Sequence, residues 1–580
     1  MENNTFTPSS SHPSSHLPPP IVPPFTLPLS PGPIPPTGLS SPSSSLSANS
    51  SLLSMHRLAR AELTTLLDEA GNNTNSSSGI RAKNRFELED NASFAHVPYA
   101  SLTIDCSWRD LLFAYRTTLL APESAESRRE LYEKIARLFT QRRNVYESVE
   151  SMTAAASTSS ASSTSSAASS SSRIPPPSLI NVNSTLSSSL VAPKYLLSEH
   201  NIFTGLSART CLDLYLTSRA FPRGSFILLS AINIPDMSVV LKAHGLVPVP
   251  IDVDVDTLEP DLVSLNQAAG RVLNGQKAVA ILVAHLFGRR FAMDEIVRIG
   301  HAHGLDVIED LAQSFSGFEY VGHPQSELTL FSFGTIKIST GFGGGVARVR
   351  NRRTFDDMIA LQSQLPVQTR GAYFHKCVKN SLTMLALNHS FTTRTICSGA
   401  RRFNIDHRGM VVAMLRGFPD KLMERLRTQP STALLSMLYH RLSSFDPIVF
   451  QHHQDNCDLM IELLPKGVTV PGRDAPVRNH WLFPVLVDHS DDVLKELVNA
   501  GIDTFKGATQ LALVPKPDGF NGQIQSTPKA AKIMEQVIYL PVDRRLSTDA
   551  IVRIAATMHR VIERVEKRHQ RANGQLVSKL

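Results

Sequence analysis

The pattern of apolar and polar residues along the chain changes near residue 200, where a regular alternation begins. Beyond that point, short apolar runs alternate with stretches that have the period of a helix. The apolar runs predict six strands, at 225–232, 246–254, 277–288, 306–310, 328–333 and 344–349. The helical stretch at 293–304 is expected to end at Gly304. Strands that alternate with such helices indicate βαβ units, so we expect an α/β domain whose mostly parallel central sheet is sandwiched by helices.

A second, smaller α+β domain is expected towards the C-terminus. Its predicted strands are 481–488 and 536–541, and its predicted helices are 490–500 and 546–566. The expected boundaries are 174–450 for the large domain, 451–570 for the small domain and 571–580 for a terminal tail.

The residues before the large domain differ in composition. Residues 1–54 are dominated by Ser and Pro and bury too little apolar surface to offset chain entropy, so we expect a disordered tail. Residues 55–150 have helical periodicity and indicate a helical extension that packs on itself or on the large domain. Residues 151–173 are nearly all Ser, Ala and Thr, which is typical of a flexible linker.

Two features of the helical extension can be predicted residue by residue. The apolar face of its second helix is expected to contain Trp108, Leu111, Leu112, Tyr115 and Leu119. Its third helix is expected to begin with a capping box that joins Ser127 and Glu130.

Charge and cysteine content exclude several classes of protein. The net charge is +7, but the basic residues are scattered in small clusters without interleaved aromatic residues, so we expect no nucleic-acid partner. The five cysteines lie far apart without a CxxC pair, which argues against a disulfide framework and a zinc site and favours a reducing, cytoplasmic compartment. No run of about 18 apolar residues predicts a transmembrane helix, and the N-terminus lacks the pattern of a signal peptide.

The candidate chemistry lies where predicted strands end. Asp310 ends one strand, with Gln313 three residues later, and Lys337 follows another strand and precedes the glycines at 343–345. In a parallel sheet, ligands bind beyond the carboxyl ends of the strands, so Asp310 and Lys337 are expected to reach one ligand. This pair suits pyridoxal phosphate, because its aldehyde needs a lysine and its ring nitrogen needs a carboxylate.

Several blocks of sequence strengthen this interpretation. The segments "GLVPVPIDVDVDTLEPD", "VAILVAHLFGRRFAMDEIVRIGHAHGLDVIEDLAQS", "LTLFSFGTIK" and "GFGGGVARV" resemble the DegT/StrS family of pyridoxal-phosphate-dependent sugar aminotransferases. The C-terminal segments "LVNAGIDTFKGATQ" and "QVIYLPVDRRLSTDAIVRIAATM" resemble the small domain of that family, so the resemblance covers about 200–566. It implies the fold of type I pyridoxal-phosphate transferases and an active site at a homodimer interface.

The resemblance also implies roles for individual residues. Lys337 would bond covalently to the cofactor's aldehyde and later transfer a proton, and Asp310 would pair with the ring nitrogen. Gln313 would hydrogen-bond near the phenolic oxygen of the ring, and the hydroxyl of Ser332 would bind the phosphate. The backbone N–H groups of Leu206 and Ser207 would also hold the phosphate, at the start of a helix. His285 resembles a family histidine at a strand end and is equally well explained as a partly buried structural residue.

Two segments depart from the family's pattern. The family usually stacks an aromatic ring on the cofactor, whereas here the stacking position falls on Asn233 or Ile234. The stretch at 366–420 does not match the part that usually reaches across the dimer interface. Its mixed basic and apolar residues are consistent with an insertion that packs on the domain, or with contact to an anionic membrane or a long-chain substrate.

The expected function is therefore a pyridoxal-phosphate-dependent aminotransferase. It would move an amino group from a small-molecule donor, glutamate or glutamine, to a keto group on an acceptor that resembles a nucleotide sugar. A lyase, a dehydratase or a desulfurase on the same fold is an alternative, although Lys337 disfavours the sugar dehydratase branch, where histidine takes that place. A regulatory or scaffold protein with a degenerate aminotransferase domain is another alternative, which the missing aromatic residue and the long N-terminal tail motivate.

Overall fold

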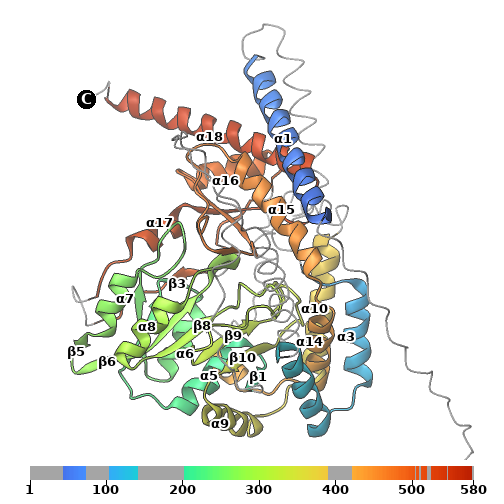
Figure 1. Ribbon diagram of the computed structural model, residues 1–580, viewed down its shortest axis with the longest axis vertical. Helices are drawn as coiled ribbons and strands as arrows, with labels where there is room; N and C mark the ends of the chain where they lie inside the picture. Colours follow the sequence, from blue (N-terminus) through green and yellow to red (C-terminus); the bar gives the residue numbers. More distant parts are fainter. Residues whose placement is uncertain are drawn as a thin grey trace, which may run out of the picture. The chain divides into compact units, whose positions relative to one another are not determined.

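A computed structural model describes residues 43–72, 104–140, 201–388, 421–502, 504–507, 511–518, 524–544 and 546–577 (Figure 1). The chain divides into two units, Met1–Met55 and His56–Leu580, and the sheet and both predicted domains belong to the second. Among the helices in these ranges, none is long and apolar enough to cross a membrane. The predicted linker at 151–173 lies outside the described residues.

The large domain is built on one central sheet. Its strands are β1 (Ile202–Gly205), β2 (Phe226–Ser230), β4 (Val247–Ile251), β5 (Val272–Leu273), β6 (Gln276–Ala284), β8 (Asp306–Asp310), β9 (Leu328–Ser332) and β10 (Gly345–Val349). The order across the sheet is β4-β2-β6-β8-β9-β10-β1, with β5 paired to β6. Neighbours from β4 to β9 run parallel, and β10 is antiparallel to β9 and β1. The mostly parallel sheet is thus confirmed, and its strands read as apolar runs because both faces are covered.

The ends of two predicted strands differ from expectation. The run at 277–288 leaves the sheet at Ala284, because the next residues form the short helical turn η2 (Leu286–Gly288), in which Phe287 has φ 56°. The run at 225–232 is divided, because β3 (Ile232–Asn233) pairs with β13 (Ala512–Leu513) of the small domain instead of continuing β2.

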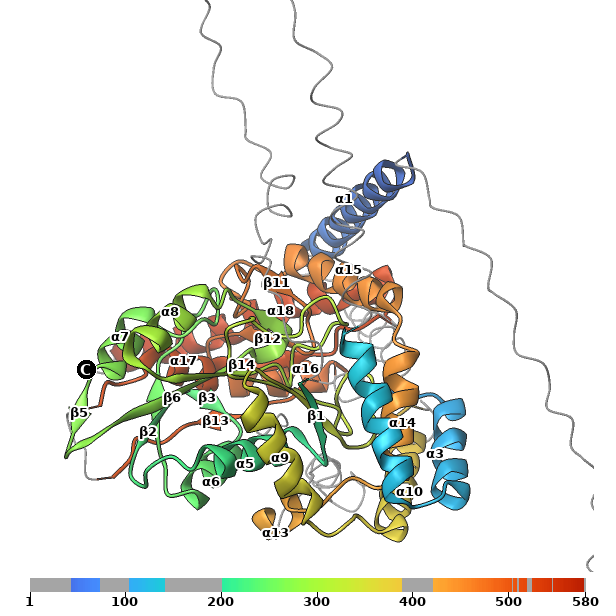
Figure 2. The same ribbon diagram turned by 60° about the horizontal axis from the view of Figure 1, so that its bottom comes forward.

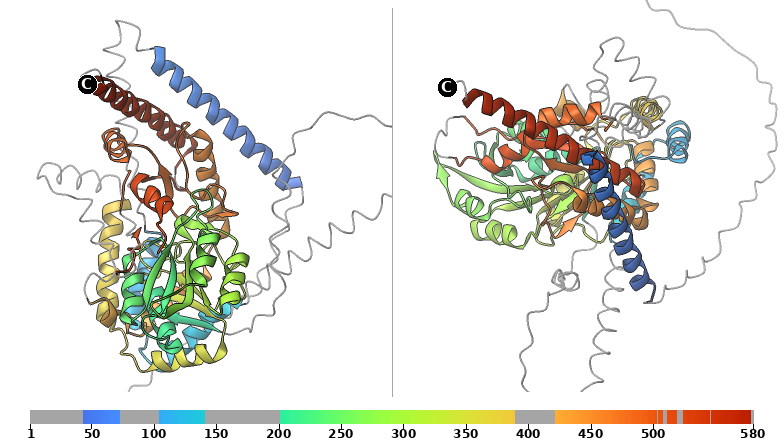
Figure 3. Two further views of the ribbon diagram at one scale, coloured as in Figure 1. Left: turned by 90° about the vertical axis from the view of Figure 1, so that its left-hand side faces the viewer. Right: turned by 90° about the horizontal axis from the view of Figure 1, so that it is seen from above.

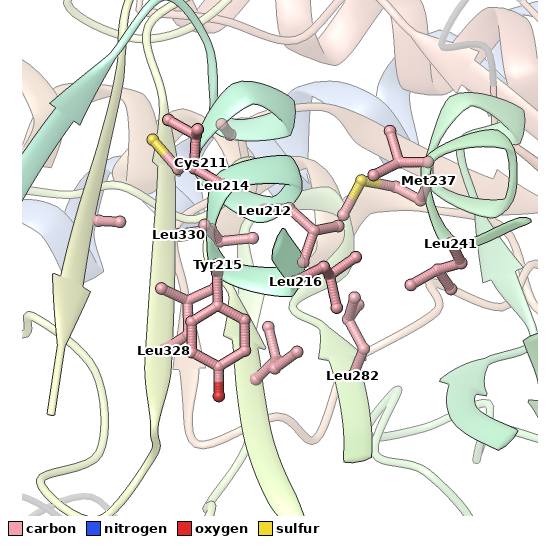
Figure 4. Close-up of a cluster of buried hydrophobic side chains, with 14 of the residues drawn as sticks. Cys211, Leu212, Leu214, Tyr215, Leu216, Met237, Leu241, Leu282, Leu328 and Leu330 are labelled. Atoms are coloured by element: carbon pink, nitrogen blue, oxygen red, sulfur yellow. The ribbon is translucent and has the colours of Figure 1, made fainter. Parts of the chain in front are cut away.

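Helices cover both faces of the sheet (Figure 2). One layer contains α5 (Ala208–Arg219), α6 (Pro235–Ala243) and α9 (Arg352–Ser363), and the other contains α7 (Leu262–Ala269) and α8 (Asp294–His303). In the first layer, Leu212 and Leu216 of α5 point towards Leu282 of the sheet (Figure 4). Helix α8 ends at Gly304, which adopts the left-handed conformation with φ 65°, as predicted.

The small domain pairs a two-stranded ladder with helices. Its elements are α15 (Pro447–Leu463), β11 (Val477–Arg478), β12 (Phe483–Leu486), α16 (Ser490–Asn499), β13, α17 (Pro528–Gln536), β14 (Val537–Leu540) and α18 (Thr548–Val577). Strands β12 and β14 pair antiparallel, and α18, the dark red helix in Figure 3, packs on α15 and α16. Helix α18 continues to Val577 and so extends into the tail predicted at 571–580, since no proline interrupts that segment.

Two short ladders join this domain to the large one at the carboxyl ends of central strands. Strand β13 pairs with β3, which directly follows β2. Strand β11 pairs with β7 (Arg289–Arg290), which follows β6 and the turn η2. Both attachments therefore lie at the edge of the sheet where a parallel sheet binds its ligands.

The N-terminal helices differ in detail from the sequence prediction. Helix α1 (Ser43–Asn72) begins inside the segment expected to be disordered, and the last proline of that segment is Pro42, directly before the helix. The helix over 125–140 is capped by Ser124, whose hydroxyl accepts the N–H of Ser127 at 3.0 Å, so a cap at Ser127 is wrong. Phe139 of this helix is buried against Phe315, Phe318 and Phe331 of the large domain, so the extension packs there.

The buried face of α3 (Trp108–Leu120) matches the predicted apolar face only in part, since Leu111 is buried as predicted. Trp108, Leu112 and Leu119 are exposed, whereas Asp110 is buried. Asp110 receives hydrogen bonds from His440 at 2.9 Å and from Arg441 at 2.7 Å, both on α14 (Thr432–Ser443). Burial raises the pKa of this carboxyl, but the hydrogen bonds from Ser107 and the charge of Arg441 hold it below its ordinary value. A buried charge needs its partners, so this ion pair sets how α3 docks.

Asp110→Ala is expected to lower the free energy of unfolding by about 3 kcal/mol, because Arg441 would keep a largely buried charge without this partner. Chemical denaturation at neutral pH measures the change. The difference from the wild type should narrow below about pH 4, since a carboxyl with a depressed pKa stabilises the fold only while it is ionised. Glu130→Ala, which removes an exposed ion pair with Lys134, is the control and should leave the midpoint unchanged. Equal stability of Asp110→Ala and Glu130→Ala would contradict the role of this pair.

Gly288→Ala is expected to disturb the ladder between β7 and β11. Gly288 has φ 82°, and an added Cβ would lie 2.5 Å from the backbone nitrogen of Trp481. Gly304→Ala is the matched control, since Gly304 also has positive φ but a Cβ there meets nothing within 4 Å. The control should lower the free energy of unfolding by about 1 kcal/mol because of backbone strain. Gly288→Ala should lower it by at least about 2 kcal/mol more. Chemical denaturation and tryptophan emission measure both; equal costs would show that the close approach is unimportant.

Candidate active site

The candidate site lies at the carboxyl ends of β6, β8 and β9 (Figure 1). Ala284 of β6 is opposite Asp310 of β8, and Asp310 is opposite Leu330 of β9. The N–H of His285 donates to the carbonyl of Asp310 at 3.0 Å, and the N–H of Leu311 donates to the carbonyl of Leu330 at 2.9 Å. These hydrogen bonds fix the three strand ends relative to one another.

The Asp310 carboxyl is buried and is held by its own backbone. Its Oδ1 accepts the N–H of Ala312 at 2.9 Å. Burial raises the pKa of Asp310, and this hydrogen bond, together with the charges of Lys337 and His285, acts in the opposite direction. The sequence prediction that Asp310 and Lys337 approach one site is consistent with this electrostatic interaction.

Lys337 follows β9 in a turn closed by its own N–H, which donates to the carbonyl of Gly334 at 3.0 Å. Its Nζ lies 3.6 Å from the centre of the Trp481 ring, and the indole N–H of Trp481 donates to the carbonyl of Ile336 at 3.0 Å. Burial lowers the pKa of Lys337 to about 7; Asp310 opposes this effect, and Arg209 adds to it. A substantial fraction of the amine is therefore unprotonated near neutral pH, as a nucleophile or a base requires.

Gln313 supports the turn that leads to the small domain. Its side-chain oxygen accepts the N–H of Phe287 at 2.9 Å, inside the turn η2. The amide nitrogen is thereby the end of Gln313 that is left to donate. The predicted contact with the phenolic oxygen of the cofactor remains a prediction.

Ser332 ends β9 and is paired in register with Gly345 of β10, which is paired with Gly205 of β1. The helix that follows β1 starts at Ala208, with Ser207 as its cap: the Ser207 hydroxyl accepts the N–H of Thr210 at 3.2 Å. The first-turn N–H groups of α5 thus stand beside the end of β1. Binding of phosphate by Ser332 and by the N–H groups of Leu206 and Ser207 remains a prediction.

The glycines at 343–345 allow the start of β10 to lie close to the start of α5. A Cβ on Gly345 would lie 2.2 Å from the backbone nitrogen of Ala208, so no other residue fits at this position without a shift of the backbone. Gly344 has φ 93°, and its N–H donates to the carbonyl of Leu206 at 2.9 Å. The close approach of the two backbone segments explains why glycines occupy this turn.

His285 has a structural partner. It is fully buried, and its Nε2 lies 3.0 Å from Oε1 of Glu309. Glu309 also accepts hydrogen bonds from the hydroxyl of Tyr320 at 2.6 Å and from the N–H of His323 at 2.7 Å. Although burial raises it, these hydrogen bonds and the interaction with His285 hold the pKa of Glu309 at about 2.

Three residues near the site were not predicted from the sequence. Trp481 comes from the small domain, Arg209 is in the first turn of α5, and Lys376 is on α10 (Arg370–Asn388). The tryptophan in "NHWLFP" begins the strand predicted at 481–488, but no local spacing connects it to Lys337, which is distant in sequence. Asn233, one of the two expected stacking positions, is buried on β3, and its side-chain oxygen accepts the N–H of Ile234 at 2.8 Å.

The chemistry of these groups fits pyridoxal phosphate. An amine with a lowered pKa suits the aldehyde, and a buried carboxylate near it suits a ring nitrogen. The glycine turn at 343–345 packs closely against the start of α5, and a helix N-terminus suits a phosphate group. Among the described residues, no cluster of His, Cys, Asp or Glu could hold a metal ion.

Comparisons with known proteins agree with this chemistry. Residues 192–392 match the DegT/DnrJ/EryC1/StrS aminotransferase family. The chain is 28% identical over 191 residues to GDP-perosamine synthase from Escherichia coli O157:H7, covering 30% of this chain and 50% of that protein. It is 34% identical over 124 residues to L-glutamine:2-deoxy-scyllo-inosose aminotransferase from Streptomyces paromomycinus, covering 20% of this chain and 28% of that protein.

The fold has a counterpart among solved structures. Spr1654 from Streptococcus pneumoniae, described as a candidate sugar aminotransferase in its apo form, superimposes with a TM-score of 0.51 at 15% sequence identity. The match covers 81% of this chain and 98% of that one. The chain spans half of the length of the first curated relative and between 30% and 66% of the next two. The segment 192–392, which is similar to the DegT/DnrJ/EryC1/StrS aminotransferase family, includes both Lys337 and Asp310.

Proposed function

We propose that this protein is a pyridoxal-phosphate-dependent aminotransferase. The observation that carries the proposal is the amine of Lys337, which lies at a strand end, interacts with the buried Asp310 and has a pKa lowered to about 7. Outside functional sites, such a perturbation by burial and a specific charged partner is uncommon. The family match over the same residues supports the same reaction.

The roles of the chain's own residues follow from this geometry. When bound, pyridoxal phosphate supplies an aldehyde that condenses with amines and a ring that accepts electrons. Lys337 would provide the unprotonated Nζ that holds the aldehyde carbon, and the same nitrogen, once released, would carry a proton. Asp310 would pair its carboxylate with the ring nitrogen and keep that nitrogen protonated. The ring of Trp481 lies against Nζ.

The substrates are proposed from the names of the relatives. GDP-perosamine synthase and L-glutamine:2-deoxy-scyllo-inosose aminotransferase support an acceptor that resembles a nucleotide sugar or another polyhydroxylated ring, with glutamate or glutamine as the donor. We further propose that the enzyme is a cytoplasmic homodimer, as the resemblance to the family implies. No observation favours a lyase, a dehydratase, a desulfurase or a scaffold over transamination.

Lys337→Ala is expected to abolish the visible absorbance of the lysine-bound cofactor and the glutamate- or glutamine-driven conversion of cofactor to its amine form. Both follow from loss of the amine that is proposed to bond to the aldehyde and to move the proton. Absorbance spectra of the purified, cofactor-saturated protein, before and after addition of donor, measure them. Lys242→Ala removes an exposed lysine of α6 and is the control that should behave as the wild type. A cofactor-saturated wild type without the band, or without donor-driven conversion, would contradict the proposal.

The titration of Lys337 tests its environment directly. In the cofactor-free protein, acetylation of Lys337 at graded pH, followed by mass spectrometry, should have a midpoint near pH 7. Asp310→Asn should move the midpoint to lower pH, because the carboxylate raises the pKa of this amine. Exposed lysines in the same digest serve as an internal control and should have midpoints about three units higher. A midpoint of Lys337 that coincides with theirs would show that the amine is not tuned by the site.

A further inference from the structure

We propose that Lys376, on α10, is a phosphate-binding residue of the cofactor site and that it acts together with Arg209 and the start of α5. This inference rests on the proposed function. It assigns a role to a part of the segment 366–420, whose sequence departs from the family's pattern and which contributes none of the residues named so far for the cofactor.

The position of the Lys376 ammonium is defined by the glycine turn. A Cβ built on Gly343 would lie 3.0 Å from Nζ of Lys376 and 3.9 Å from the carbonyl oxygen of Leu206. Nζ therefore lies where the turn before β10 meets the loop between β1 and α5. This is the place where the first-turn N–H groups of α5 offer an anion site.

The anchoring of α10 explains why Lys376 reaches this place. Tyr373 is fully buried, and its hydroxyl donates to the carbonyl of Gly341 at 2.9 Å, at the start of the same glycine turn. Residues three apart on a helix share one face, so Lys376 points in the direction of Tyr373. A second bond, between the hydroxyls of Tyr115 and Ser381 at 2.8 Å, holds α10 against α3.

Electrostatics point to an anion at this position. Arg209, the second residue of α5, pairs with Asp236 and still lowers the pKa of both Lys337 and Lys376 by repulsion. Burial is the larger cause for Lys376 and brings its pKa to about 8. Arg209 therefore lies within electrostatic range of the amines of both Lys337 and Lys376, so positive charge is concentrated at the start of α5. A phosphate dianion has the charge and the acceptor oxygens that two of these cations and a helix N-terminus would satisfy.

The test compares pyridoxal phosphate with pyridoxal, which lacks the phosphate, on the full-length protein freed of cofactor. Binding is followed by quenching of tryptophan emission, to which Trp481 beside Lys337 contributes. Trp108→Phe serves as the background, so that Trp481 is the only remaining tryptophan. Lys376→Met should weaken binding of pyridoxal phosphate at least tenfold and leave binding of pyridoxal unchanged, and inorganic phosphate should no longer compete. Lys376→Arg should retain most of the affinity, because the positive charge is kept.

Lys379→Met, on the same helix, is the matched control and should bind pyridoxal phosphate as the wild type does. Lys376→Gln serves as a second variant if Lys376→Met unfolds, which chemical denaturation reveals. A wild type that binds pyridoxal phosphate with the same affinity as Lys376→Met or Lys376→Gln would overturn this inference and leave the proposed function standing. A wild type that binds neither pyridoxal phosphate nor inorganic phosphate would overturn both.

Discussion

The burial of one amine against one carboxylate organises this protein. The Nζ of Lys337 lies over the ring of Trp481, and burial makes its ammonium form unfavourable. Asp310 opposes the effect, and the result is a pKa of about 7. This balance depends on the positions of both groups. The register of β8 fixes the position of Asp310, and the turn closed by the N–H of Lys337 fixes the position of the lysine.

A network beneath the site keeps the end of β8 rigid. Glu309 points away from Asp310 and collects hydrogen bonds from His285, Tyr320 and His323, which offset the cost of burying its charge. Arg348 of β10 is also buried and donates to the carbonyls of the loop that contains His323. Because His285 also donates its N–H to the carbonyl of Asp310, the same network fixes the ends of β6 and β8 together.

The sheet and the reactive residues near its strand ends could be predicted because each depends on a short, continuous stretch of sequence. Apolar runs reported the buried strands, Gly304 ended its helix, and Asp310 and Lys337 follow from their place after such runs. What failed depends on contacts between distant segments. The buried face of α3 is decided by Arg441, and no periodicity within 107–120 contains that information.

The same limit explains the residues of the site that the sequence did not reveal. Trp481 reaches Lys337 only because β11 pairs with β7, and Lys376 reaches the glycine turn only because Tyr373 bonds to Gly341. Each depends on a helix or a ladder that forms between parts of the chain far apart in sequence. Local patterns report burial and strand ends, whereas the lining of the site is set by tertiary pairing.

The attachment of the small domain gives the site a property that the large domain alone would lack. Strand β11 of the small domain pairs with β7, which directly follows the turn η2 that Gln313 holds. Trp481 follows β11 in the chain. The aromatic residue expected after β2 is replaced there by Asn233 and Ile234, and the aromatic side chain beside the reactive amine comes instead from the other domain. The contact of Nζ with the Trp481 ring therefore joins the reactive lysine of the large domain to the small domain.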